Sequence, residues 1–277
     1  MAIVFDGKGY SEKKKMLLQA SVDLLRGQGI IPHLATLLIG DNPASLLYTN
    51  LKKKFIESLG CQVDVYSLNK SAKFEEIELL IKSLNHDQTV HGIMVQFPLP
   101  QEFRGKRKEI IDIIDSKKDV DGLKADSKFL HPTAKAAMEV LALAIYETRH
   151  EVKTICVIGA TGMVGRPLVK ELKKLGYIVL EVDDKTDELE QQSFALQSDV
   201  LVSATGVMNL ITPEMVREGS IVIDVGAPHG DVHPLVEERV SFITPVPRGV
   251  GPVTITCLAE NLIISAQSTI TSNIDAK

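Results

Sequence analysis

The stretch TICVIGATGMVGRP, residues 154–167, joins an apolar strand pattern to a glycine-spaced turn and the start of a helix. Gly159, Gly162 and Gly165 stand where the chain would pass from strand to helix. Backbone N–H groups and the helix dipole favour a pyrophosphate at such a turn. The spacing is GxxGxxG rather than GxGxxG, which is weak evidence alone. Its place between a strand and a helix nevertheless favours a dinucleotide site over a bare turn.

Two acidic residues strengthen this interpretation. Asp183 and Asp184 follow the next expected strand, residues 178–182, roughly 20 residues beyond the turn. A carboxylate there can accept hydrogen bonds from the adenine ribose hydroxyls and repels the extra 2′-phosphate of NADP. The sequence therefore predicts a nicotinamide dinucleotide as cofactor and favours NAD.

Strand and helix patterns alternate on both sides of the turn, which predicts an α/β fold with parallel sheets in two units. The expected first unit is residues 1–130, onto which a C-terminal helix, 254–277, packs back; a Rossmann-type unit covers 131–253. The expected strands are residues 33–39, 62–66, 92–96, 154–158, 178–182, 199–203 and 221–225. The expected helices are residues 11–26, 43–59, 74–84, 133–146 and 254–266, with a loop over 245–252 before the last. The segments between the strands 154–158, 178–182 and 199–203, and part of the stretch before 221–225, are also expected to be helical.

Composition excludes several classes of protein. The chain has 277 residues and a net charge of −5, which argues against a nucleic-acid binder. Cys61, Cys156 and Cys257 lie far apart without metal-ligand spacing, so we expect no metal and a reducing compartment. The chain shows neither the apolar core of a signal peptide nor an apolar run that approaches a membrane span. We therefore expect a cytoplasmic protein with neither membrane nor nucleic acid as partner.

A lysine on the expected helix 43–59 is a candidate for proton transfer. Tyr48 and Lys52 are four residues apart and share one face of that helix. We expect Lys52 at the border of the buried face, where partial burial would lower its pKa toward the working pH. Spacing alone favours a surface lysine that extends into solvent. The apolar residues expected to form the neighbouring buried stripe are Leu47, Leu51, Phe55 and Leu59.

Two further polar residues could converge on Lys52. Gln96 ends the third expected strand, and open α/β sheets bind ligands beyond the carboxyl ends of their strands. Asp121 lies in a loop of turn residues. Taken singly, Gln96 could merely close a strand and Asp121-Gly122 could be only a turn.

Five motifs occur in order and carry a family resemblance: GDNPAS..Y...K (40–52), GIMVQFPLP (92–100), KDVDG (118–122), VIG....VGRP (157–167) and ITPVPRGVGPVT (243–254). Together they resemble the bifunctional methylenetetrahydrofolate dehydrogenase/methenyltetrahydrofolate cyclohydrolase family over residues 33–263. The resemblance implies an enzyme of one-carbon metabolism and a homodimer. It makes the first unit the folate-binding catalytic domain. Methylenetetrahydrofolate would pass a hydride to NAD(P), and the methenyl product would be hydrolysed to 10-formyltetrahydrofolate.

The resemblance also implies residue roles, with no metal required. Lys52 would transfer protons in the cyclohydrolase step, with Tyr48 positioning the folate, Gln96 keeping the lysine uncharged and Asp121 anchoring the pterin. The implied substrate-binding residues are Tyr48, Lys52, Val95, Gln96, Phe97, Asp121, Pro245, Val246, Pro247, Arg248, Gly249, Val250, Gly251, Pro252 and Val253. The implied cofactor-binding residues are Gly159, Ala160, Thr161, Gly162, Val164, Gly165, Asp184, Thr205, Gly206 and Ala227.

Departures from the family pattern bear on cofactor choice and on efficiency. Ala160-Thr161 replaces an Arg-Ser pair and Asp184 replaces a serine, which favours NAD although NADP is the family default; Lys185 could restore phosphate binding. Arg248 replaces a loop glycine that would tolerate a positive φ, and it could instead pair with the glutamate tail of the substrate. HPTAKA (131–136) stands where the family has PCTPxG.

Three alternatives remain open on the sequence alone. One is a cyclohydrolase whose dehydrogenase activity is impaired by Ala160 and Arg248. Another is a two-domain oxidoreductase similar to shikimate dehydrogenase. The third is a non-catalytic paralogue that binds folate or a dinucleotide. The joint presence of Tyr48, Lys52, Gln96 and Asp121 favours the bifunctional enzyme over all three.

Overall fold

The structure is a computed structural model that describes residues 1–275, and it divides into two compact units. One unit combines Met1–Glu12 with His131–Cys257 and contains a six-stranded sheet. The other combines Lys13–Leu130 with the chain from Leu258 onward and contains a three-stranded sheet. We call them the six-stranded unit and the three-stranded unit. Helices α1 (Gly7–Gly27) and α8 (Val250–Asp275) contribute residues to both.

The three-stranded unit has the order β3-β2-β4, and all its strands are parallel. Alternate residues of each strand enter different cores, as the pleat requires. Leu34 and Met94 pack in a core with α1, α2 and α8, whereas Leu37 and Ile93 pack in a core with α3 and α4. The elements are β2 (His33–Ile39), α2 (Pro43–Glu57), β3 (Gln62–Leu68), α3 (Phe74–His86), β4 (Gly92–Val95), the 3₁₀ helix η1 (Gln101–Lys106) and α4 (Arg107–Ile113).

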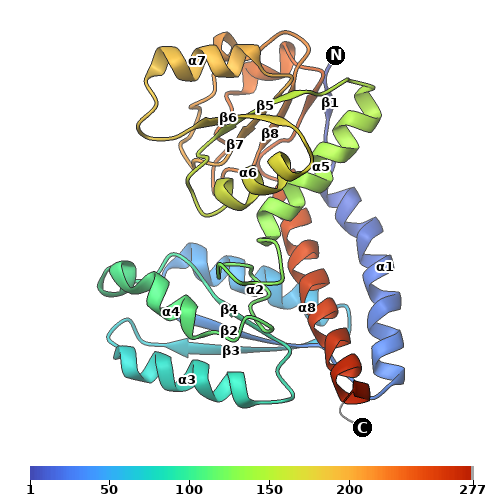
Figure 1. Cartoon of the computed structure of the whole chain (residues 1–277), viewed down its shortest axis with the longest axis vertical. Coiled ribbons are helices and arrows are strands. Elements are labelled where there is room, and N and C mark those ends of the chain that lie inside the picture. The colour runs from blue at the N-terminus through green and yellow to red at the C-terminus, as the bar shows by residue number, and fades with distance from the viewer. Residues whose placement is uncertain (276–277) are drawn as a thin grey trace. The chain divides into compact units, whose positions relative to one another are not determined.

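The six-stranded unit has the order β1-β9-β8-β7-β5-β6, again entirely parallel (Figure 1). Its central strands are buried along almost their whole length, which explains their nearly continuous apolar sequences. The strands are β1 (Ile3–Val4), β5 (Thr154–Ile158), β6 (Ile178–Val182), β7 (Val200–Ser203), β8 (Ile221–Asp224) and β9 (Phe242–Ile243). The helices are α5 (Pro132–Thr148), α6 (Gly165–Lys174), α7 (Glu188–Gln197), η2 (Pro213–Met215) and η3 (Pro234–Glu238).

The first residues of the chain lie elsewhere than expected. We had placed residues 1–12 with the first unit, but β1 pairs with β9 at the edge of the six-stranded sheet. The N–H of Ile3 donates to the carbonyl of Ser241 at 2.8 Å, and the Phe5 ring packs 6.0 Å from that of Phe242. Strands of two residues leave no periodicity in a sequence, so neither β1 nor β9 was predicted.

Helix boundaries also differ from expectation. Helix α8 begins at Val250, so the last residues of the expected 245–252 loop form its first turn. Helix α4 was not predicted. Among the residues that the structure describes, no helix is long and apolar enough to cross a membrane.

Candidate functional site

Helix α2 carries the candidate lysine. It begins with Asn42, whose side chain accepts a hydrogen bond from the N–H of Ser45 at 3.0 Å, and Pro43 occupies its first turn. The expected apolar stripe was wrong in part, because Leu47 and Leu51 are 58% and 43% exposed. The buried face instead runs through Ser45, Thr49 and Ile56, and Lys52 continues that face toward the sheet.

Lys52 meets the end of β4. Met94 and Gln96 are two residues apart, so their side chains lie on the same face of the strand. Lys52 Nζ donates to Gln96 Oε1 at 3.0 Å and lies 3.5 Å from Met94 Sδ. Gln96 Nε2 donates to the carbonyl of Phe97 at 2.7 Å. Because this second bond uses the amide nitrogen, it fixes the amide with its oxygen toward the lysine.

Opposing effects set the charge of Lys52. Burial lowers its pKa below the usual value, because an ammonium loses hydration there. The negative charge of Asp121 acts in the opposite direction and raises that pKa. A lysine under both influences can change its protonation state during a reaction, which a fully hydrated lysine at neutral pH does rarely.

The loop that carries Asp121 is fixed on both sides. The N–H of Ile93 on β4 donates to the carbonyl of Lys118 at 2.8 Å. Asn261 on α8 donates through Nδ2 to the carbonyl of Val120 at 2.9 Å. Gly122 follows with a φ of 64° and turns the chain. The expected convergence of Lys52, Gln96 and Asp121 is therefore present in the structure.

The other expected folate-binding residues of this unit differ in access. Tyr48 is half-buried one turn before Lys52 on α2. Phe97 is half-buried beside Gln96, and its carbonyl also accepts from Ser45 Oγ at 3.2 Å. Val95 is 1% exposed and packs in the α3–α4 core, on the opposite face of β4 from Gln96. Its side chain is thus turned away from Lys52.

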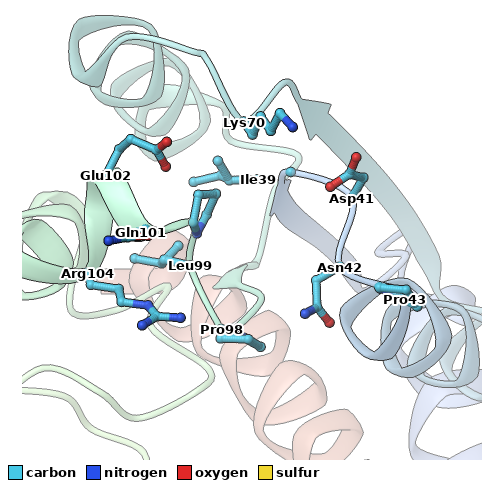
Figure 2. A pocket seen from close by; sticks show the side chains of 12 residues that line it. Ile39, Asp41, Asn42, Pro43, Lys70, Pro98, Leu99, Gln101, Glu102 and Arg104 are labelled. Atoms are coloured by element: carbon cyan, nitrogen blue, oxygen red, sulfur yellow. The ribbon is translucent and has the colours of Figure 1, made fainter.

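A hollow of about 440 Å³ lies beyond the ends of β2 and β4 (Figure 2). It is lined by the segment from Ile39 to Pro43, by Lys70, and by residues that follow Gln96 along the chain, namely those from Pro98 to Glu102 and Arg104. Its charged residues are Asp41, Lys70, Glu102 and Arg104, two of each sign, so it has no net preference for anions or cations. Lys52 and Gln96 do not line it.

The glycine turn of the six-stranded unit is tight. Gly159 has a φ of 85°, and a Cβ there would lie 2.7 Å from the carbonyl oxygen of Ala204. A Cβ on Gly165 would lie 2.1 Å from the carbonyl oxygen of Gly159. Neither position can therefore hold a side chain. Gly162 and Thr161 are exposed directly before α6. This close, open backbone before a helix fits a dinucleotide pyrophosphate.

The remaining expected cofactor residues lie near the carboxyl ends of the strands. Asp184 and Lys185 are exposed after β6. Thr205, half-buried, and Gly206, exposed, follow β7, and exposed Ala227 follows β8. Ala160 is buried and Val164 half-buried in the turn itself. This edge of a parallel sheet is where open α/β folds bind ligands.

The loop before α8 contains strained backbone. Arg248 has a φ of 84°, a region that favours glycine, as the expected replacement of a glycine implied. A Cβ on Gly249 would lie 2.4 Å from the carbonyl oxygen of Pro245. Val250 and Val253 were expected in a loop beside the folate, but they are helical and buried. Pro245, Val246 and Pro252 are half-buried; Pro247, Arg248 and Gly251 are exposed.

The departure at 131–136 leaves a well-formed helix start. His131 is the N-cap of α5, and its Nδ1 accepts from the N–H of Thr133 at 3.2 Å. Pro132 occupies the first turn, where it costs no hydrogen bond. The sequence HPTAKA therefore begins this helix without the family's usual residues.

Sequence reasoning missed residues that shape both sites. Met94 could have been found, because its spacing from Gln96 places the two on one face of the strand. Asn261 donates to the loop that carries Asp121, and Asp231, after β8, accepts from Thr205 in the loop after β7. Both partners are distant in the sequence, and nothing in a single sequence indicates them.

The fold and these two sites define an α/β protein with two parallel-sheet units, one of them of the dinucleotide-binding type. The family model for the catalytic domain of tetrahydrofolate dehydrogenase/cyclohydrolase matches residues 5–121, and the model for its NAD(P)-binding domain matches residues 131–270. The chain belongs to the tetrahydrofolate dehydrogenase/cyclohydrolase family. This membership excludes the alternative similar to shikimate dehydrogenase.

Known relatives resemble the chain over nearly its whole length. The bifunctional protein FolD of Campylobacter jejuni (strain 81-176) is 40% identical, over 96% of this chain and 98% of its own. A crystal structure of the Campylobacter jejuni enzyme has a TM-score of 0.90 at 38% identity and covers 97% of this chain and 100% of its own. The Trypanosoma brucei enzyme, complexed with NADP and an inhibitor, has a TM-score of 0.88 at 28% identity over 97% and 98%.

Proposed function

We propose that this protein oxidises 5,10-methylenetetrahydrofolate to 5,10-methenyltetrahydrofolate with NAD(P)⁺ and hydrolyses the product to 10-formyltetrahydrofolate. The observation that carries this proposal is the buried pair formed by Lys52 and Gln96, with Nζ and Oε1 3.0 Å apart, under the charge of Asp121. Family membership supports the substrate, and the tight glycine turn supports the dinucleotide.

The oxidation demands orientation more than acid–base chemistry. A nicotinamide dinucleotide, when bound, would supply the hydride acceptor for the methylene carbon. The pyrophosphate would bind at the N-terminus of α6, where the first N–H groups of a helix have no partner within the helix. The N–H groups of Gly159 and Ala160 donate instead to the carbonyl of Val182, which fixes the turn before that helix. Asp121 would accept hydrogen bonds from the pterin, and Tyr48, one turn before Lys52 on α2, would help to order the substrate.

The hydrolysis demands a group that first takes and then returns a proton. Neutral Lys52 accepts a proton from the water that adds to the methenyl carbon. The resulting ammonium donates this proton to the ring nitrogen as the bond between that nitrogen and the carbon breaks. The hydroxyl of the adduct releases its own proton to water as the C=O bond forms, which leaves the formyl group on the other nitrogen. Gln96 Oε1 accepts from Lys52 in both states and so keeps Nζ in place. The opposing effects of burial and Asp121 keep both protonation states accessible.

The cofactor preference and the assembly belong to the same proposal. We infer a preference for NAD, because exposed Asp184 opposes a 2′-phosphate and Ala160 supplies no cation for it. A homodimer follows from the resemblance alone, and sedimentation would test it.

The decisive experiment follows reduced-nicotinamide absorbance with methylenetetrahydrofolate, using NAD and NADP in parallel. Turnover with either cofactor supports the dehydrogenase and gives the preference. If neither cofactor is reduced by folded protein that still hydrolyses methenyltetrahydrofolate, the protein is a cyclohydrolase that has lost its dehydrogenase activity. Silence in both assays would contradict the proposed function.

A further inference from the structure

Asp231 lies in the segment after β8 and is completely buried, at 0% exposure. Its Oδ2 accepts three hydrogen bonds: from Ser203 Oγ at 2.7 Å, and from both the N–H and the Oγ1 of Thr205 at 2.8 Å. Ser203 is the last residue of β7, and Thr205 is the second residue of the loop that follows it. A single carboxylate thus ties the loop after β7 to the segment after β8.

This loop also supports the glycine turn. A Cβ on Gly159 would lie 2.7 Å from the carbonyl oxygen of Ala204 and 3.4 Å from Thr205 Cγ2. The first glycine of the turn therefore packs directly against Ala204 and Thr205. Asp231 holds Thr205 and also Ser203, the residue before Ala204. Thr205 Oγ1 additionally accepts from the N–H of Val207 at 3.1 Å, which fixes the onward course of the loop. Contacts thus lead from Asp231 through Thr205 to Gly159.

A second buried carboxylate, Asp224, lies beside Asp231. Asp224 accepts from the N–H groups of Gly226 at 2.8 Å and Val232 at 2.9 Å. A Cβ on Gly226 would lie 2.2 Å from Asp231 Oδ1 and 3.0 Å from Asp224 Oδ1, so both carboxylates press on this glycine. Burial, and secondarily the charge of Asp231, raise the pKa of Asp224. Asp224 therefore takes up a proton more readily than a hydrated carboxylate.

We propose that Asp231 is a positioning residue for the dinucleotide: it touches no ligand, but it holds Thr205 against Gly159 and so keeps the glycine turn in the shape that binds the pyrophosphate. This inference rests on the proposed function only in that a dinucleotide binds at this turn.

Asp199 offers a matched control at the opposite end of β7. It lies directly before Val200, and its Oδ2 accepts from the N–H groups of Lys153 at 2.9 Å and Thr154 at 3.0 Å. Its Oδ1 accepts from Arg217 at 2.8 Å. The Asp199 side chain thus accepts as many hydrogen bonds as that of Asp231 and also joins β7 to neighbouring segments. It does so at the start of the strand, away from the glycine turn at the other end of the sheet.

The experiment measures binding of NADH and NADPH by fluorescence, together with KM for each dehydrogenase substrate. We expect Asp231→Ala to weaken dinucleotide binding roughly tenfold to a hundredfold, because several bonds to a charged acceptor are lost. KM for the dinucleotide should rise in parallel while KM for methylenetetrahydrofolate stays near the wild-type value. Asp231→Asn should restore part of the affinity, because its amide oxygen can still accept from Thr205. Asp199→Ala should bind like the wild type even if it unfolds at a lower temperature.

The outcomes separate the two proposals. A wild-type protein that binds neither dinucleotide would defeat the proposed function. Wild-type binding with unchanged affinity in Asp231→Ala, or an equal loss in Asp199→Ala, would overturn the positioning role. If Asp231→Ala does not fold, the comparison passes to Asp231→Asn and Asp199→Asn. Weaker dinucleotide binding in Asp231→Asn alone supports the inference, and equal binding in Asp231→Asn and Asp199→Asn overturns it.

Discussion

Lys52 Nζ donates to Gln96 Oε1 across 3.0 Å, although the two residues are 44 positions apart in the chain. The contact exists because Gln96 follows β4 on the face that Met94 also occupies, and α2 places Lys52 over that face. Water cannot fully hydrate the ammonium there, so the amide oxygen is the neutral partner that holds the amine in either charge state. A carboxylate in place of Gln96 would instead stabilise the charged form.

Loss of the amine should stop ring opening. Lys52→Met should lower the rate of methenyltetrahydrofolate hydrolysis by about a hundredfold or more, because positioned proton transfer contributes roughly 10²- to 10⁴-fold. The decay of methenyltetrahydrofolate absorbance measures it. Lys54→Met is the matched control, since Lys54 is exposed on the same helix and should leave the rate unchanged. Undiminished hydrolysis in Lys52→Met would remove Lys52 from its role.

The pH dependence of ring opening should reveal the charge balance at Lys52. Activity should rise with pH through the pKa of Lys52, which burial holds below the usual lysine value of 10.5, because only the neutral amine accepts a proton. Gln96→Glu adds an anion beside Lys52 and should move this rise in activity to higher pH. Asp121→Asn removes the charge that raises the pKa and should move it to lower pH. Shifts in the same direction for both variants would refute this account.

Much of the fold could be predicted because buried strands and helices have characteristic patterns of apolar residues in the sequence. The seven expected strands were located closely, since an apolar run between turn residues is typical of a parallel sheet; only the two-residue strands β1 and β9 were missed among the described residues. The face of α2 was the exception. Leu47 and Leu51 suggested the buried stripe, but Ser45 and Thr49 occupy it, and a pattern of apolar residues cannot detect small polar ones that pack inward.

The supporting residues of both sites could not be predicted in the same way. Asn261 contacts the Asp121 loop across 141 positions, and Asp231 contacts Thr205 across 26. Each is a polar residue with no local pattern, and its role depends on which segments the sheet brings together. The motifs suggested that Lys52, Gln96 and Asp121 lie near one another, whereas the residues that hold this group in place are visible only in the folded structure.

The backbone at Arg248 should store strain that glycine relieves. A φ of 84° costs a residue other than glycine about 1–2 kcal/mol in the folded state. Glycine avoids this cost, but its greater conformational entropy in the unfolded chain cancels part of the gain in stability. We expect Arg248→Gly to raise the free energy of unfolding by about 0.5–1 kcal/mol in urea titrations. Arg248→Ala keeps the strained φ and should bring no such gain. An equal gain in both variants would trace the effect to the lost charge rather than to the backbone.

A buried histidine should make the protein less stable in mild acid. Burial lowers the pKa of His91, and the charges of His33 and Lys118 lower it further. The native state therefore binds fewer protons than the unfolded state just below pH 6.5, so stability is present above that pH and declines as pH falls. His91→Asn keeps an acceptor for the N–H of His33, which now bonds Nδ1 at 3.2 Å. Urea titrations at about pH 7.5 and 5.5 should show a smaller loss in this variant; an equal loss would assign the effect to other groups.

Cofactor choice should respond to the two exposed charges after β6. If Asp184 repels the 2′-phosphate, Asp184→Ser should raise the ratio of kcat/KM for NADP to that for NAD by roughly five- to tenfold, the size expected for one charge near the surface. Lys185→Ser is the charge change of opposite sign one residue away, and it should move the ratio toward NAD. Ratios measured at low and at high salt should converge, because screening weakens both effects. If neither variant changes the ratio, the 2′-hydroxyl lies away from this turn, and the preference has to come from Ala160 or from the backbone around Thr161.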